Sequence, residues 1–132
     1  MEFDSKYPIY LQIVNEIKRK IIIGELVPGN KLPSNNDLAI MYKVNPNTVQ
    51  RIYKQLEYEG LCFTKRGLGT FLIEDPNLPT RLKIESVTTM VSNFLDKMSS
   101  LGFTASETIN IIKDVAGNKH KKGEKKARKL KI

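Results

Sequence analysis

The chain has 132 residues, of which 40% are hydrophobic and 27% charged, the balance of an ordinary globular protein. This length fits one domain with a short appendage, so we expect neither a large two-domain enzyme nor a separate ligand-sensing domain. No apolar run approaches the roughly 20 residues that cross a bilayer, and the start lacks the features of a signal peptide. The single cysteine, Cys62, fits a reducing compartment. We therefore expect a cytoplasmic protein without a membrane partner.

The net charge of +8 is concentrated at one end of the sequence. Residues 118–132 hold eight basic residues and one acid, whereas the other 117 residues hold 14 basic and 13 acidic side chains. The high isoelectric point therefore belongs mainly to this basic tail and does not by itself indicate nucleic-acid binding by the folded part. Three interpretations of the tail stay open: a disordered solubilising end, an arm that binds phosphates, or a short helix that packs Ala127 and Leu130 against a neighbouring chain.

Periodic apolar residues predict two helices at the start of the chain. Isoleucines recur at every fourth position between Pro8 and Ile23, which indicates a helix over that range. Ser34 can cap the free N–H groups of a second helix, and Asp37 suits its positive end. The buried side of this second helix is predicted to comprise Leu38, Met41 and Tyr42.

A third helix is predicted after a tight turn at residues 43–45. Asn45 can cap this helix, Pro46 suits its first position, and Gly60 should end it after about Glu59. Apolar residues lie on one face of the helix and polar residues on the other, as expected for the outward-facing helix of a helix-turn-helix. The inward face is predicted to comprise Val49, Ile52, Tyr53 and Leu56, and the outward face Asn47, Gln50, Arg51 and Lys54.

Two short apolar runs, 61–64 and 70–73, predict a β-hairpin in which Cys62 is a small core residue. The tip between them, residues 65–69, carries two basic residues and two glycines, so a thin loop can approach a phosphate backbone closely. Helix, helix, tight turn, helix and hairpin together predict a winged helix-turn-helix domain over residues 1–75. The expected fold class is mainly α with a small β-hairpin.

Residues 76–117 are predicted to form a short helical dimerisation region. After a linker at 74–79, an amphipathic helix should run from about Arg81 to Ser99, and Thr104 with Glu107 resembles a capping box that starts a last helix over 105–116. Two helices cannot enclose a core, so their apolar side chains must fold back on the winged part or pair with a second copy. Pairing with a second copy is favoured, because a symmetric homodimer can bind two half-sites of a DNA duplex. We name the dimerisation candidates the C-terminal stripe: Val87, Met90, Val91, Phe94, Leu95, Met98, Ile109 and Ile112.

Residues 8–73 resemble the DNA-binding domain of the GntR-type bacterial transcription regulators. The short C-terminal part and the form Val-Asn-Pro-Asn-Thr-Val are similar to the YtrA subfamily. The segments that carry this resemblance are Gly29-Asn30-Lys31-Leu32-Pro33-Ser34, Asp37-Leu38-Ala39, Val44-Asn45-Pro46-Asn47-Thr48-Val49, Leu56-Glu57-Tyr58-Glu59-Gly60-Leu61 and Arg66-Gly67-Leu68-Gly69-Thr70-Phe71.

The resemblance implies a homodimeric regulator, usually a repressor and often of a transporter operon, that binds an inverted repeat in double-stranded DNA. It implies that Asn45, Asn47, Thr48, Gln50 and Arg51 meet the major groove, with Arg66 and Gly67 near the minor groove. Ser34, Asn35, Asn36, Lys54, Lys65 and Gly69 complete the set of predicted DNA contacts. Many family members carry Arg where this sequence has Asn36, and several carry Arg in place of Pro46 and Gln50. Weaker phosphate and guanine contacts are therefore expected at those positions.

Two other classes of function are considered. For an enzyme the chain offers neither a catalytic couple nor a metal set, because His120 is its only histidine and Cys62 its only cysteine, so we expect no catalysis, metal or cofactor. The alternative function is a winged helix that binds protein or RNA without operator specificity. The sequence does not identify a small-molecule effector, which we would expect to bind between the C-terminal helices.

Overall fold

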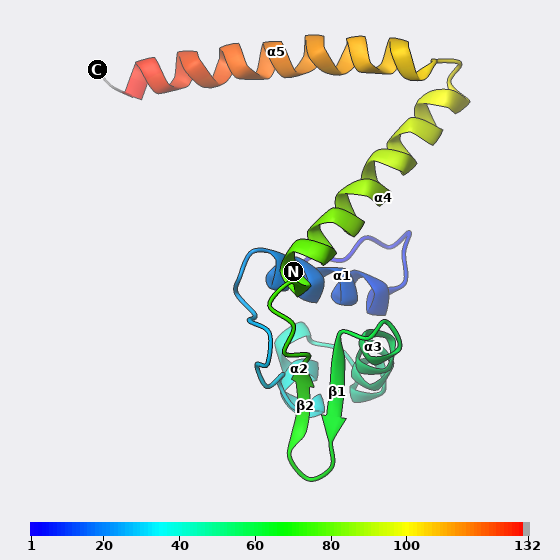
Figure 1. Ribbon diagram of the computed structural model, residues 1–132, viewed down its shortest axis with the longest axis vertical. Coiled ribbons are helices and arrows are strands. Elements are labelled where there is room, and N and C mark those ends of the chain that lie inside the picture. The colour runs from blue at the N-terminus through cyan, green and yellow to red at the C-terminus, as the bar shows by residue number, and fades with distance from the viewer. Residues whose placement is uncertain (131–132) are drawn as a thin grey trace. The chain divides into compact units, whose positions relative to one another are not determined.

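A computed structural model of the chain describes residues 1–130, with side chains described as far as residue 120. Within that part the elements follow in the order α1 (Ile9–Ile22), α2 (Asn35–Tyr42), α3 (Pro46–Tyr58), β1 (Cys62–Lys65), β2 (Gly69–Leu72), α4 (Leu78–Ser100) and α5 (Ala105–Leu130) (Figure 1). The predicted fold class, a winged helix-turn-helix followed by C-terminal helices, is confirmed. The chain divides into a compact winged unit, Met1–Glu85, and a second unit that begins at Ser86.

Local hydrogen bonds start α2 and α3 at the predicted residues. Ser34 Oγ accepts the backbone N–H of Asp37 at 3.1 Å, and Asn45 Oδ1 accepts that of Asn47 at 2.8 Å. Each bond satisfies a donor that the first turn of a helix leaves free. Between the two helices Lys43 adopts a left-handed conformation with φ of 54°, which makes the predicted tight turn.

The core of the winged unit joins α1, α2 and α3 to the hairpin and to the start of α4. Its buried side chains are Ile13, Val14, Ile17, Ile21, Leu32, Leu38, Ala39, Tyr42, Val49, Ile52, Tyr53, Leu56, Leu61, Cys62, Leu72, Leu78 and Leu82. The predicted burial of Met41 is wrong, since its side chain is 54% exposed. The short α2 buries Leu38, Ala39 and Tyr42 on one face, and Met41 lies off that face. Ile9, in the first turn of α1, is also exposed.

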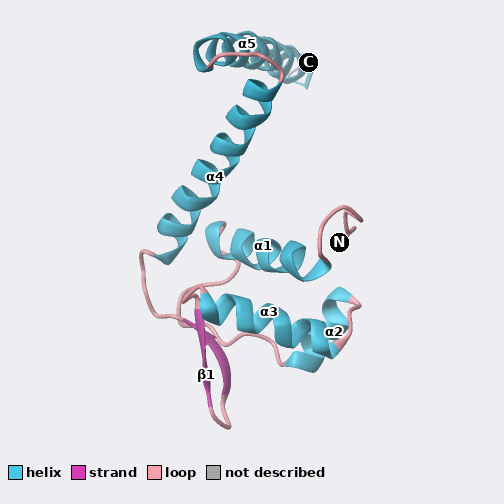
Figure 2. Cartoon of the chain, turned by 90° about the vertical axis from the view of Figure 1, so that its right-hand side faces the viewer, coloured by secondary structure: helices cyan, strands magenta, loops and turns pink. Residues whose placement is uncertain are grey.

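The hairpin pairs Cys62 with Leu72 and Lys65 with Gly69, so each strand lies one residue nearer the tip than predicted. The loop before α2 pairs along β2: the Leu32 N–H donates to the Thr70 carbonyl at 2.8 Å, and the Leu72 N–H to the Asn30 carbonyl at 2.9 Å. This pairing holds the hairpin beside the start of α2 while its tip projects from the helices (Figure 2).

α4 begins at Leu78, inside the segment that the sequence predicts as a linker. Pro79 lies in the first turn of the helix, where a proline has no hydrogen bond to lose. Leu78 and Leu82 are 0% and 2% exposed and belong to the core of the winged unit. Burial of these two leucines therefore starts the helix before the amphipathic pattern that predicted it.

Backbone hydrogen bonds form the turn between α4 and α5. The N–H groups of Gly102 and Phe103 donate to the carbonyls of Ser99 and Met98, each at 3.0 Å, which satisfies the last turn of α4. The Thr104 N–H donates to Glu107 Oε1, and the Glu107 N–H donates to Thr104 Oγ1, both at 3.1 Å. These two bonds confirm the predicted capping box.

The predicted end of the last helix at Ala116 is wrong. α5 continues through Gly117 and Asn118 to Leu130. Glycine costs a helix only about 1 kcal/mol relative to alanine. The lysines and alanines around the two residues are good helix formers, so the helix carries across them. Contacts of the basic tail from residue 121 onward lie outside the described side chains and stay a prediction. Within residues 1–130, no helix combines the length and the apolarity needed to cross a bilayer.

Cys62 is buried in the hairpin, and we expect its thiol to resist alkylation while the protein is folded. Burial raises the pKa of this thiol from 9.0 to about 12, so the reactive thiolate is scarce at pH 8. Mass spectrometry after iodoacetamide treatment should show labelling in denaturant and protection in buffer. Equal labelling rates under both conditions would contradict the burial.

Because only the unfolded thiol loses its proton just above pH 9.0, the free energy of unfolding should also fall as the pH rises from there to about 12.

Candidate nucleic-acid interface

α3 turns its apolar side inward and its polar side toward solvent. The predicted inward residues Val49, Ile52, Tyr53 and Leu56 are all buried. Asn47, Arg51 and Lys54 are exposed and recur at a spacing of four and three residues, which places them along one line of the helix. Gln50 is exposed beside that line. The polar side chains are therefore available to a ligand that lies along α3.

Two hydrogen bonds hold α3 against its neighbours. The Tyr53 hydroxyl donates to the Pro33 carbonyl at 2.5 Å, and burial raises the pKa of this phenol, so the donor keeps its proton. Glu57 Oε1 accepts the backbone N–H of Thr64 in β1 at 3.2 Å. These bonds connect α3 to the loop before α2 and to the hairpin, so the three parts of the candidate surface are held in register.

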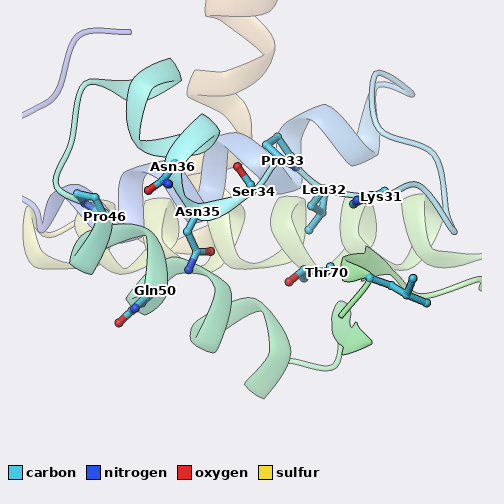
Figure 3. Close-up of a pocket in the computed structure, with 11 residues that line it drawn as sticks. Lys31, Leu32, Pro33, Ser34, Asn35, Asn36, Pro46, Gln50 and Thr70 are labelled. Atoms are coloured by element: carbon cyan, nitrogen blue, oxygen red, sulfur yellow. The ribbon is translucent and has the colours of Figure 1, made fainter. Parts of the chain in front are cut away.

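An open groove of about 580 Å³ separates the start of α2 and α3 from the hairpin. In Figure 3, Asn35, Asn36 and Gln50 lie at one side of the groove and Lys31 and Thr70 at the other. The first-turn N–H groups of α2 carry the positive end of its dipole, which favours a phosphate at this place. The groove brings together predicted contacts from three elements: Ser34, Asn35, Asn36, Gln50 and Gly69.

The tip of the hairpin carries its two cations in different settings. Lys65 Nζ lies 5.1 Å from the centroid of the Phe71 ring and 5.6 Å from that of Phe63, so its ammonium rests near an aromatic pair. Arg66 and Gly67 are exposed at the tip, where Gly67 has a φ of 78°. Since glycine adopts this conformation without a steric penalty, the tip stays narrow.

Lys31 and Thr70 line the same groove, although the sequence does not predict them as contacts. Lys31 lies beside the hairpin, because a Cβ built on Gly69 would come within 2.8 Å of Lys31 Cε. Because Gly69 has no side chain, Lys31 can occupy this position beside the hairpin. Lys31 reaches the hairpin through the pairing of the loop with β2, and no local sequence signal reveals that pairing.

The remaining predicted contacts do not line the groove. Asn45 is exposed, but its side-chain oxygen is used to cap α3, and Thr48 is half-buried. Arg51 is exposed, and its side chain reaches α1, where its Cζ is 3.9 Å from the centroid of the Tyr10 ring. The predicted residues thus form a surface with two parts: a groove beside α2 and the hairpin, and an outer face of α3 beside α1.

Known proteins resemble both the sequence and the fold. Residues 9–72 match the family described as bacterial regulatory proteins, gntR family. The HTH-type transcriptional regulator YhcF of Bacillus subtilis is 42% identical over 112 residues, which span 85% of this chain and 93% of YhcF. The chain belongs to the GntR family.

Other GntR proteins extend this similarity. The HTH-type transcriptional repressor YtrA of Bacillus subtilis is 43% identical over 94 residues, which span 71% of this chain and 70% of YtrA. A solved GntR family transcriptional regulator from Listeria monocytogenes matches with a TM-score of 0.76 at 38% identity, over 85% of this chain and 98% of that one. The resemblance to the YtrA subfamily that the sequence predicts is confirmed.

Membership of the GntR family makes the chain a transcriptional regulator and decides against the enzyme alternative. DNA binding is implied by the family's helix-turn-helix.

In this GntR protein the C-terminal stripe is accessible along the single chain. Met90, Val91 and Phe94 are 67%, 56% and 41% exposed, Val87, Ile109 and Ile112 are also exposed, and Leu95 and Met98 are half-buried. Among the described residues, α4 and α5 do not pack along each other beyond their connecting turn. Six of the eight side chains of the stripe therefore stay exposed on a single chain.

Proposed function

We propose that the protein is a homodimeric repressor that binds an inverted-repeat operator and occludes a promoter. In the proposed complex each α3 lies in the major groove of one half-site, with the hairpin at the adjacent backbone or minor groove. The observation that carries the proposal is the exposed line of Asn47, Arg51 and Lys54 along α3, supported from within by a buried inner face.

The outward side chains have the chemistry to read base edges. The amides of Asn47 and Gln50 can each bond two atoms of adenine, and the Arg51 guanidinium can bond guanine O6 and N7 together. These side chains come from successive turns at the start of α3, the part of a recognition helix that contacts bases in helix-turn-helix proteins. They are therefore the residues that we expect to determine sequence preference.

Groups around the groove can anchor the phosphate backbone. The start of α2 presents N–H groups, Lys31 supplies a cation beside the hairpin, and Arg66 is exposed at the hairpin tip. Such contacts fix the orientation of the protein on the duplex without reading its sequence. A groove that combines them beside Gln50 suits one strand of the backbone at the edge of the major groove.

The C-terminal stripe supports a dimer. Its apolar side chains recur at helical spacing, most of them are exposed on a single chain, and pairing with a second copy would remove them from water. A two-fold dimer presents two copies of α3, which matches the symmetry of an inverted repeat. The relative YtrA is named a repressor, and its similarity favours repression over activation here.

The aromatic residues weigh against the RNA-binding alternative. RNA modules stack single-stranded bases on exposed rings. In this chain Tyr53 is buried, and Phe63 and Phe71 are half-buried and stacked on each other, with centroids 6.1 Å apart. These three rings are therefore already in use within the hairpin and the core, whereas Tyr58, which is 87% exposed, takes no part in that stack.

Selection from a library of random duplexes, followed by sequencing and fluorescence anisotropy, tests the proposal. We expect an inverted repeat whose half-sites lie about 34–36 Å apart, or a multiple of this distance, bound by two chains. Single-stranded RNA of the same sequence should not compete. Enrichment of one asymmetric site bound by one chain, or efficient competition by RNA, would overturn the proposal.

A further inference from the structure

Arg51 is predicted to read a base edge. Among the predicted base-reading residues in the described part of the chain, it alone stacks on an aromatic ring. Its Cζ lies 3.9 Å from the centroid of the Tyr10 ring, well inside the range of about 6 Å over which a guanidinium and a ring attract. Tyr10 belongs to α1 and Arg51 to α3, so the contact joins two helices. Arg51 is exposed, whereas Tyr10 is half-buried and packs against the core.

The stacking leaves the hydrogen-bonding capacity of the arginine intact. A guanidinium is planar and its five N–H donors point outward in that plane, so a ring against its face blocks none of them. An unsupported arginine samples many rotamers and loses this freedom when it binds a base. The Tyr10 ring restricts that freedom before DNA arrives, which is how preorganisation increases affinity.

The platform under Arg51 is itself held in place. The Gln12 side chain accepts the backbone N–H of Asp4 at 2.8 Å and donates to the carbonyls of Asp4 and Tyr7 at 2.7 and 3.0 Å. These bonds close a turn just before α1, and α1 packs directly on α3. Tyr10 is therefore held by the core beneath it, on a helix whose preceding turn is closed by Gln12.

From this geometry we propose that Tyr10 is a positioning residue for operator recognition. By stacking on Arg51 it directs the guanidinium toward one base pair, so sequence preference at that pair depends on a residue that touches no base. The proposal rests on the proposed DNA-binding function and adds to it the residue that orients the Arg51 guanidinium toward its base pair.

Four proteins test the proposal: the wild type, Tyr10→Phe, Tyr10→Leu and Arg51→Ala, each measured by anisotropy on the selected operator and on variants of each base pair. Tyr10→Phe keeps the ring and should bind within about twofold of the wild type. Tyr10→Leu removes the ring but keeps an apolar side chain, and should lose about 3- to 10-fold on the best operator. It should also flatten the preference at the base pair where Arg51→Ala flattens it.

The double variant Tyr10→Leu with Arg51→Ala separates positioning from a structural effect. In the Arg51→Ala background, Tyr10→Leu should change affinity by less than about twofold, because the group that Tyr10 positions is absent. An equal loss in both backgrounds would overturn the proposal. A loss in Tyr10→Phe as large as in Tyr10→Leu would also overturn it, since the phenol hydroxyl would then be the active group.

Thermal melting by circular dichroism checks that each variant is folded, and Tyr10→Met replaces Tyr10→Leu if the latter is unfolded at the assay temperature. The two proposals can fail separately. If the wild type selects no duplex, the proposed function fails. If the wild type selects an operator but Arg51→Ala leaves its base preferences unchanged, DNA binding stands and the role of Tyr10 is overturned.

Discussion

Phe94→Glu is expected to convert the protein to a monomer and to weaken binding to an inverted repeat by about 10²- to 10⁴-fold. Phe94 lies in the middle of the C-terminal stripe and is 41% exposed on the single chain. In the proposed dimer the new carboxylate would be buried in the interface, and a buried unpaired charge is costly. The two DNA-reading surfaces would then bind one at a time, without the gain that linkage provides.

Asn93→Glu is the matched control, because it adds the same charge at the adjacent, exposed position on another face of α4. Analytical ultracentrifugation should give a dimer for the control and a monomer for Phe94→Glu, and anisotropy on the same duplex should follow the assembly state. A Phe94→Glu protein that stays dimeric and binds with full affinity would place the subunit interface outside the stripe.

Asn47→Ala and Arg51→Ala form the second large prediction. Each lost base contact should cost about 1–3 kcal/mol, and each contact occurs twice in a symmetric complex, so the total loss approaches about 2–6 kcal/mol for either variant. Both side chains are exposed on the outer line of α3, and the fold should tolerate their truncation.

The pattern of the loss distinguishes base reading from phosphate binding. If these side chains read bases, each variant should lose affinity for the best operator and lose discrimination at particular base pairs. Asn93→Ala removes the same amide as Asn47→Ala from an exposed position on α4 and should leave both quantities unchanged. A loss that is uniform over all duplexes would instead assign the residues to phosphate contacts.

The sequence predicts those features that local chemistry decides. Ser34 and Asn45 form the predicted caps because a short polar side chain can reach the N–H of its own next turn. Thr104 and Glu107 form the capping box for the same reason. The inward and outward faces of α3 also follow from residue spacing alone, and that is why the exposed candidates along this helix were predictable.

Features that depend on distant parts of the chain could not be predicted in this way. Leu78 starts α4 early because the core of the winged unit buries it, and Lys31 lies at the groove because its loop pairs with β2. The stacking of Arg51 on Tyr10 likewise joins residues from two helices. Periodicity identifies the face of a helix, but it does not identify the neighbour that meets that face.

The lack of packing between α4 and α5 has a thermodynamic consequence for the proposed dimer. Beyond their turn, these helices have no shared interior within the described part of one chain, so mutual burial with a second chain would supply much of their stability. By mass action, such helices become more stable as protein concentration rises and fray on dilution. The winged unit has its own apolar core and should keep its structure at concentrations that loosen the C-terminal helices. Concentration in the cell would then govern how much of the regulator is competent to hold its operator.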